Sequence, residues 1–244
     1  MAVSSPLPRR KRSRAKTARV YASWNAPLSA HGQSQELVLA FERGRDKRLL
    51  VLPPLFDEHN KLRRQIVEVM RRLDGAGIDT ILPDLPGWNE SPAPLEEQSL
   101  TGWRKAASEA ADEFAATHVL AIRGGALLAP SALPGFLYAP TKGRQILRSL
   151  LRARTIAARE AGREEKVDTL LEIGRSEGLE LAGWKFGAEM IAELEEAEYP
   201  TGPGLRTINQ ATLGGSPLWL RAEPSEAADQ ADALAAVVAL ELTA

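Results

Sequence analysis

The sequence predicts an α/β protein with a mostly parallel sheet and helices on both faces. Short apolar segments alternate with amphipathic ones, as in the apolar runs at 79–83 and 118–122 on either side of a helical pattern at 101–116. A strand–helix–strand connection of this length joins parallel strands. The 244 residues are 44% hydrophobic and 26% charged, which fits one large globular domain or two small ones.

The first 34 residues are expected to form a basic, disordered N-terminal segment. Residues 1–19 hold seven lysines and arginines and no acid, which leaves 24 basic and 32 acidic residues in the rest of the chain. The basic stretch is either a solvated tail, or the product of a start codon placed too early, or an arm that binds polyanions. Because the body is acidic, nucleic acid is not expected as a partner apart from this tail. The seven residues are Arg9, Arg10, Lys11, Arg12, Arg14, Lys16 and Arg19.

A sheet-containing core is expected over 35–139 and 200–244. Apolar runs at 36–42 and 48–53 around Gly44 predict a hairpin. An apolar stripe that begins at Leu62 predicts a helix ending near Gly75. Near the end of the chain, 216–224 is expected to be the last strand and 226–241 the closing helix.

A helical, cap-like insertion is expected at 140–199, because the strand–helix alternation stops there. It begins with a long basic helix at 142–162 and holds a strand at 179–186 and a helix at 188–197.

The composition limits which kinds of metal site, cofactor site and membrane segment the protein is expected to have. There is no cysteine and there are only three histidines, so neither a metal site nor a cofactor is expected. No apolar run reaches about 18 residues, so no membrane span is expected, and a cytoplasmic location is the expectation.

The strand at 118–122 runs directly into Arg123, Gly124 and Gly125. A strand followed at once by small residues and a helix resembles the nucleophile elbow, G-x-S-x-G, of α/β-hydrolases. Such a turn forces its central residue, here Arg123, into a strained backbone conformation. An upstream loop, Asp84-Leu85-Pro86-Gly87 followed by Ser91, is similar to the D-x-P-G-x-G-x-S loop of the same enzymes.

In more detail, the chain resembles the exosortase A system-associated α/β-hydrolases of the type called hydrolase 2, in pieces over about 50–222. The resemblance implies an α/β-hydrolase-like sheet and a link to exopolysaccharide and protein-sorting systems, but it supplies no substrate. The sequence departs from the family pattern at Asp57, at His59 and at 88–90. The matching residues are Pro53, Pro54, Glu58, Asn60, Lys61, Arg63, Arg64, Arg123, Gly125, Ala126, Pro140, Gly143, Leu147, Leu151, Arg152, Arg154, Gly183 and Trp184.

A Ser-His-Asp triad cannot be assembled from this sequence. Arginine stays protonated and cannot attack a carbonyl, and no histidine follows His118. Catalysis would need an unusual route through His59 or Ser91, which are weak catalytic candidates. A catalytically silent protein, a pseudoenzyme, is the favoured interpretation.

Arg123 is the main candidate ligand-binding residue. With the N–H groups of Gly124 and Gly125 it would hold a carboxylate or phosphate at the carboxyl end of a parallel strand. Trp88 would lie beside that ligand. Asn60 is a further binding candidate, although capping of the following helix is its commoner role. The alternative for Arg123 is a structural arginine tied to Asp84 or Glu58.

Three functions therefore stay open. The protein is a hydrolase or acyl-transfer enzyme with a non-standard nucleophile, or it binds a small acidic or acylated ligand at Arg123. Otherwise it is a partner in an envelope or polysaccharide assembly, using the cap helix and the basic tail.

Overall fold

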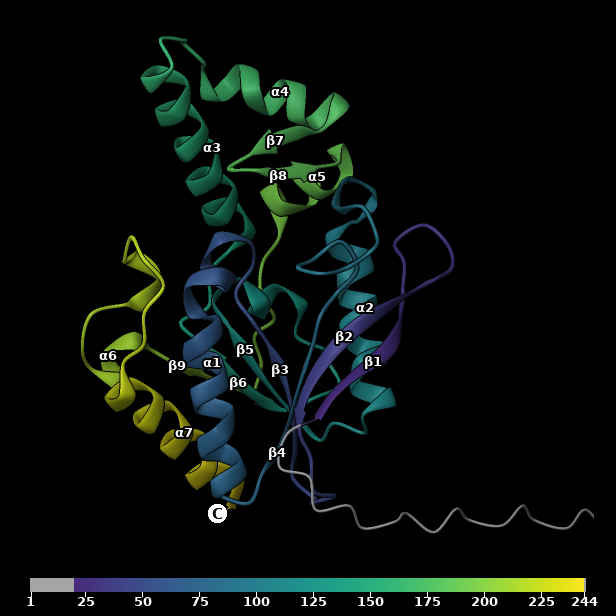
Figure 1. The fold of residues 1–244 in the computed structure, drawn as a ribbon, viewed down its shortest axis with the longest axis vertical. Coiled ribbons are helices and arrows are strands. Elements are labelled where there is room, and N and C mark those ends of the chain that lie inside the picture. Colours follow the sequence, from purple (N-terminus) through teal and green to yellow (C-terminus); the bar gives the residue numbers. More distant parts are fainter. Residues whose placement is uncertain (1–19, 244) are drawn as a thin grey trace, which may run out of the picture.

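A seven-stranded sheet forms the centre of the computed structural model, which describes residues 20–243 (Figure 1). The strand order is β1-β2-β4-β3-β5-β6-β9. The β1–β2 and β2–β4 pairs are antiparallel and the other pairs are parallel, which confirms the mostly parallel sheet. The strands are β1 (Val20–Pro27), β2 (Gln33–Phe41), β3 (Arg48–Leu52), β4 (Asp79–Pro83), β5 (His118–Ile122), β6 (Gly135–Tyr138) and β9 (Leu205–Ile208).

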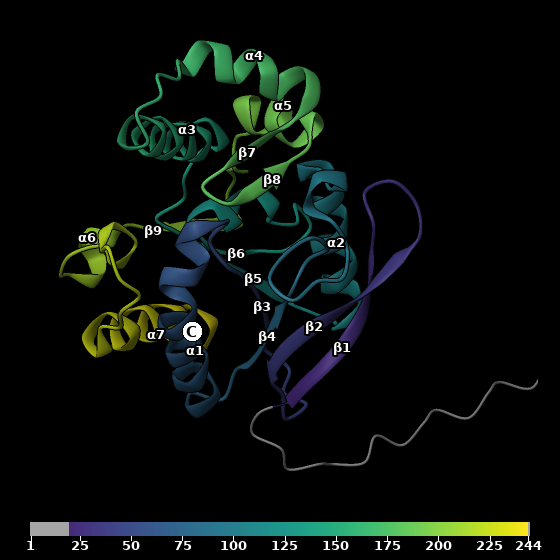
Figure 2. The same ribbon diagram turned by 45° about the horizontal axis from the view of Figure 1, so that its top comes forward.

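Helices cover both faces of the sheet, as predicted. Helices α1 (Asp57–Gly75) and α7 (Ala228–Thr243) pack together on one face, and α2 (Leu100–Glu113) lies on the other (Figures 1 and 2). All five residues of β3 are buried, because a central parallel strand is covered on both sides. The shorter helical elements of the core are η1 (Leu95–Glu97), η2 (Arg123–Leu128), α6 (Gln210–Leu213) and η3 (Leu218–Leu220).

The elements between β6 and β9 group beyond the carboxyl ends of β3 and β5, at the top of Figure 1, and lie within the predicted insertion. The expected strand at 179–186 is a hairpin of two short strands. Its turn has Ala182 at φ 50° and Gly183 at φ 82°, the positive φ values that favour two-residue hairpin turns. The elements are α3 (Gly143–Glu160), α4 (Val167–Glu177), β7 (Leu179–Leu181), β8 (Trp184–Phe186) and α5 (Ala188–Glu196).

The expected disordered segment at 1–34 is too long. Residues 20–34 contain β1 and the start of β2, and residues 1–19 lie outside the described part of the chain. Trp24 and Ala26 are buried whereas Ser23 and Asn25 are exposed, since only one face of this edge strand packs on the core. Two of its eight residues, Ser23 and Asn25, are polar and the strand ends at Pro27, which made this part of the chain resemble a Pro/Ser-rich loop.

The predicted hairpin of 36–42 and 48–53 is wrong, because β4 lies between β2 and β3. The connecting loop wraps around the start of β4 and is held by the buried carboxylate of Asp79. This carboxylate accepts hydrogen bonds from the main-chain N–H groups of Arg43 (3.0 Å), Gly44 (2.9 Å) and Arg45 (2.9 Å). The guanidinium of Arg48 lies 3.4 Å from it, and that of Arg45 lies 3.1 Å away.

Two further boundaries differ from the prediction. The segment expected as the last strand holds the short helix η3, with Leu218 buried and Leu220 75% exposed, and β9 is the last strand instead. Helix α1 begins at Asp57, so Asn60 is an exposed residue of its first turn and does not cap it. Within residues 20–243, no helix is long and apolar enough to cross a membrane.

We expect Asp79→Asn to destabilise the fold by about 2–3 kcal/mol, because the variant loses a charged acceptor that serves three N–H groups and two guanidinium groups at a fully buried position. Urea unfolding measures the change. Asp46→Asn, in the same loop but exposed, is the matched control. An equal effect of both variants would contradict the role given to Asp79.

Candidate functional site

The chain turns sharply where β5 ends, at the carboxyl edge of the sheet. Arg123 has φ 53°, so the strained conformation expected at the centre of the elbow is present. A Cβ on Gly125 would lie 2.4 Å from the carbonyl oxygen of Pro53, and one on Gly124 would lie 2.8 Å from Ile146 Cδ1. Position 125 therefore requires glycine, because main-chain atoms at the end of β3 lie against it, whereas a side chain at position 124 would have to displace side chains of Ile146 and Leu55.

The Arg123 side chain is paired with Glu58, in the first turn of α1. Its Nε donates to Oε2 of Glu58 and its Nη2 donates to Oε1, both at 3.0 Å. Its Nη1 donates to the carbonyl oxygen of Ala139 at 2.8 Å, and its Cζ lies 4.3 Å from the ring centroid of Trp219. The structure thus ties Arg123 to Glu58, one of the two acids considered, and not to Asp84.

This ion pair is only partly accessible, with 17% of the Arg123 side chain and 28% of the Glu58 side chain exposed. Trp219 also packs edge-on against Tyr138, whose hydroxyl donates to Gln210. Burial raises the pKa of Tyr138 to about 12, so it stays protonated and is a hydrogen-bond donor. The apolar flank that Trp219 gives Arg123 was not predicted, because the sequence around Trp219 was expected to be a strand.

His59 is buried, with 1% of its surface exposed. Arg63 Nη1 lies 3.4 Å from its Nε2, and Asn89 Nδ2 lies 3.3 Å from the same atom. A guanidinium only donates, so Nε2 accepts and the proton of the neutral ring lies on Nδ1. Nδ1 is buried and has no partner among the described residues. Burial first, and then the positive charge of Arg63, lowers the pKa of His59 to about 4.

Ser91 is held within its loop and does not meet His59. Its Oγ donates to Oε1 of the buried Glu36 at 2.7 Å and accepts from the N–H groups of Gly87 (2.8 Å) and Ala93 (3.1 Å). The hydroxyl therefore fixes the shape of the 84–93 loop. The two weak catalytic candidates are not brought together by the fold.

Asn89 links His59 to Asp84, the residue that follows strand β4. Asn89 was not identified as a candidate from the sequence. Its Nδ2 donates to Oδ1 of Asp84 at 2.9 Å, and its backbone has φ 49°. Burial raises the pKa of Asp84, although the Asn89 hydrogen bond and the charge of Arg63 act in the opposite direction. The signal in the sequence that could have identified it is an asparagine in a tight loop, because asparagine tolerates positive φ better than most residues.

Aromatic side chains fill the space above the carboxyl ends of β3 and β4. Trp88 is 3% exposed and stacks on Trp103 with ring centroids 5.1 Å apart. Phe56 lies between Trp103 (5.8 Å) and Phe186 of the cap hairpin (4.8 Å). Trp88 therefore packs within the core and its ring is not open to a ligand in this structure.

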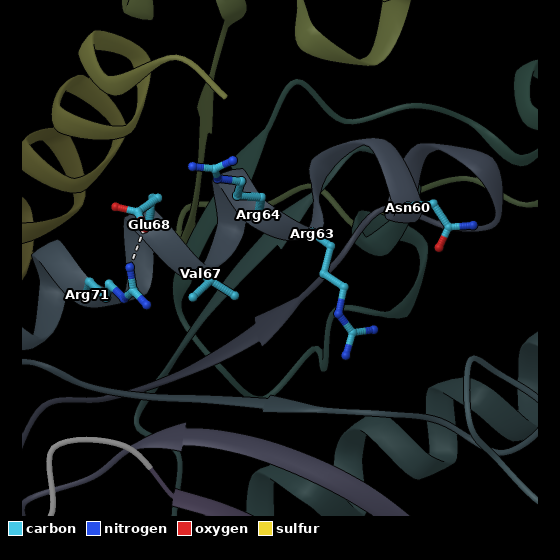
Figure 3. A pocket seen from close by; sticks show the side chains of 6 residues that line it. All are labelled: Asn60, Arg63, Arg64, Val67, Glu68 and Arg71. Atoms are coloured by element: carbon cyan, nitrogen blue, oxygen red, sulfur yellow. Dashed lines mark hydrogen bonds and ion pairs between the residues drawn. The ribbon is translucent and has the colours of Figure 1, made fainter. Parts of the chain in front are cut away.

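An open groove of about 510 Å³ runs along α1, and its six lining side chains all come from that helix (Figure 3). Asn60 lies at one end of it and Arg71 toward the other, with the cationic Arg63 and Arg64 between them (Figure 3). Arg123 and Trp88 do not line this groove. The structure therefore separates Asn60 from the other ligand-binding candidates.

The sequence matches no known family profile and no curated protein. Solved structures with the same fold include a candidate hydrolase from Agrobacterium vitis, with a TM-score of 0.56 at 10% identity over 92% of this chain and 98% of that one. Mouse α/β-hydrolase domain-containing protein 10 gives 0.53 at 15% identity over 78% of this chain and 77% of its own. A hypothetical protein from Pseudomonas aeruginosa gives 0.50 at 10% identity over 80% and 78%.

Because the sequence identities are so low, the similarity to these structures shows the fold alone. The strand order, the turn after β5 and the similar structures together show that this protein has an α/β-hydrolase fold, as the sequence predicts.

We expect the stability of the protein to fall with decreasing pH through His59. Its pKa is about 4 in the folded state and about 6.5 when unfolded, so the unfolded chain binds a proton first and stability is lost between pH 6.5 and pH 4. The loss at pH 4 is about 3 kcal/mol relative to pH 7. The difference in unfolding free energy between wild type and His59→Phe isolates it, with His31→Phe in an exposed loop as the control. A difference that does not vary with pH would show that the imidazole titrates alike in both states.

Proposed function

We propose that this protein is a non-hydrolytic α/β-hydrolase-fold protein of the exosortase- and exopolysaccharide-associated type, which binds an acidic ligand at Arg123. The observation that carries the proposal is Arg123 itself, in the strained turn after β5. This is the position at which hydrolases of this fold carry the nucleophilic serine. A guanidinium is always protonated and has no lone pair with which to attack an acyl group.

Among the described residues, no histidine is placed at the turn to act as the general base of a triad. His118 begins β5, so it lies at the opposite edge of the sheet from Arg123. His59 is buried, and its Nε2 already accepts hydrogen bonds from Arg63 and Asn89. A triad needs a histidine within about 3 Å of the attacking hydroxyl, and neither residue supplies one.

An anionic ligand at Arg123 would compete with Glu58. Three of the five guanidinium N–H groups make the bonds to Glu58 and Ala139, which leaves two free. A carboxylate or phosphate can replace the Glu58 carboxylate in the same two-point geometry, because both present paired oxygens. Trp219 then provides an apolar wall for the rest of a small acidic or acylated ligand.

The absence of hydrolysis is tested with a fluorophosphonate probe and a panel of short-chain aryl esters. We expect neither labelling nor turnover by the wild type or by Arg123→Ser, because the new hydroxyl has no histidine beside it to complete a triad. Turnover that disappears in Ser91→Ala or His59→Ala would instead establish a hydrolase with a non-standard nucleophile.

The anion site is tested by thermal stabilisation with inorganic phosphate and with acetate. We expect Glu58→Gln to bind either anion at least tenfold more tightly than wild type, because the variant frees the guanidinium of its competing carboxylate. Glu90→Gln removes one exposed acid from a neighbouring loop and is the charge-matched control.

Arg123→Gln should abolish the stabilisation by both anions. Equal stabilisation of Arg123→Gln and Glu58→Gln would mean that the anions bind elsewhere, and the proposal for Arg123 would be lost.

The second candidate function is a partner protein in an envelope or polysaccharide assembly. The filled aromatic space favours it, since Trp88, Trp103 and Phe56 leave little room for a substrate over β3 and β4. In that case both anions leave the thermal stability of Glu58→Gln unchanged.

A further inference from the structure

Four arginines of the cap differ from all the other arginines of the described residues. Four arginine side chains between residues 20 and 243 make no hydrogen bond or ion pair, and all four belong to α3 or to the turn that follows it. The other described arginines bond to acids, to carbonyl oxygens or to other polar groups, and these include Arg154 of the same helix, which bonds to Glu165 (2.6 Å). The four unpaired residues are Arg148, Arg152, Arg159 and Arg163, and all are exposed.

Three of these residues form a straight row. Arg148, Arg152 and Arg159 are separated by four and seven residues, so their side chains fall within about 40° of one another around the helix. The row is about 16 Å long at 1.5 Å per residue. Arg163 lies near its Arg159 end, where both arginines line an open hollow together with Glu164 and Glu165. The leucines that anchor α3 to the rest of the cap, Leu147, Leu150 and Leu151, are buried.

An apolar side chain lies at the edge of this row. Ile156 is 49% exposed, and its position places it beside Arg152 and Arg159. Helix α3 begins beside the turn after β5 and runs outward from the central sheet (Figure 1). The row is thus a local basic surface on a body in which acids outnumber bases.

We propose that this row docks on a bilayer surface that contains anionic phospholipids. The guanidinium groups would pair with lipid phosphates, and Ile156 would enter the boundary between headgroups and acyl chains. A nucleic acid fits less well, because α3 carries no aromatic residue on which bases could stack and an exposed isoleucine contributes nothing to phosphate binding. The bound anion is a lipid headgroup in a flat array, whereas the ligand of Arg123 is a single small molecule.

The test is co-sedimentation of the full chain with vesicles of phosphatidylcholine alone and of phosphatidylcholine with 30% phosphatidylglycerol. We expect binding to the anionic vesicles only. Because each arginine near an anionic leaflet contributes about fivefold, changing Arg148, Arg152 and Arg159 together to Gln should weaken binding about 100-fold. The control changes Arg71, Arg206 and Arg221 to Gln, which removes the same charge from exposed sites outside the cap. Circular dichroism checks that both variants are folded.

Ile156→Ser separates a bilayer from a soluble polyanion. It should weaken vesicle binding several-fold and leave retention on dextran sulfate unchanged.

Four results would overturn the proposal. One is no binding of the wild type to anionic vesicles, and another is an equal loss in the control variant. The third is full binding by the α3 variant that disappears when Arg9, Arg10, Lys11, Arg12 and Arg14 become Gln, which would assign the interaction to the N-terminal segment. Loss of dextran sulfate binding in the α3 variant without an effect of Ile156→Ser would point to a polyanion instead of a membrane.

Discussion

The ion pair between Arg123 and Glu58 is the interaction on which the rest of this site depends. It joins the turn after β5 to the first turn of α1, the two chain segments between which ligands bind in open α/β sheets. The pair neutralises the cation in that crevice and fixes its direction. It also explains how a non-glycine residue persists at φ 53°, since two hydrogen bonds to a carboxylate offset a backbone strain of order 1–3 kcal/mol.

The polar side chains around His59 and the 84–93 loop are also engaged in contacts within the protein. His59 is neutral, Ser91 is bonded to Glu36, and Asn89 bridges Asp84 and His59. Each of these polar side chains has the chemistry of a catalytic group, and each is engaged in holding a loop. The aromatic side chains around Phe56 pack against the same region, where Trp88 contacts the ring of His59.

The sequence predicted the features that depend on local pattern. The turn at Arg123 followed from small residues directly after a buried strand, and the cap helix α3 followed from its leucine spacing. Features that depend on pairing between distant segments were missed. The insertion of β4 between β2 and β3 is set by the contacts of Asp79 with a loop 34–36 residues earlier, and the edge strand β1 buries only one face.

The sequence predicted which residues lie at the candidate site better than it predicted their partners and their burial. Glu58 was one of two acids considered as the ion-pair partner of Arg123. Which of the two acids can contact the guanidinium depends on where helix α1 begins. The burial of Trp88 could not be foreseen, because Phe186, which belongs to the same aromatic group through Phe56, lies 98 residues further along the chain.

The close approach at Gly125 has a wider consequence. A methyl group there would meet main-chain oxygens at 2.4–2.5 Å, so the backbones of two neighbouring segments are in direct contact. Two main chains in such contact cannot slide past each other without breaking the sheet hydrogen bonds on either side. The floor beneath Arg123 is therefore rigid, and any adjustment to an incoming molecule has to come from side chains and from the cap above.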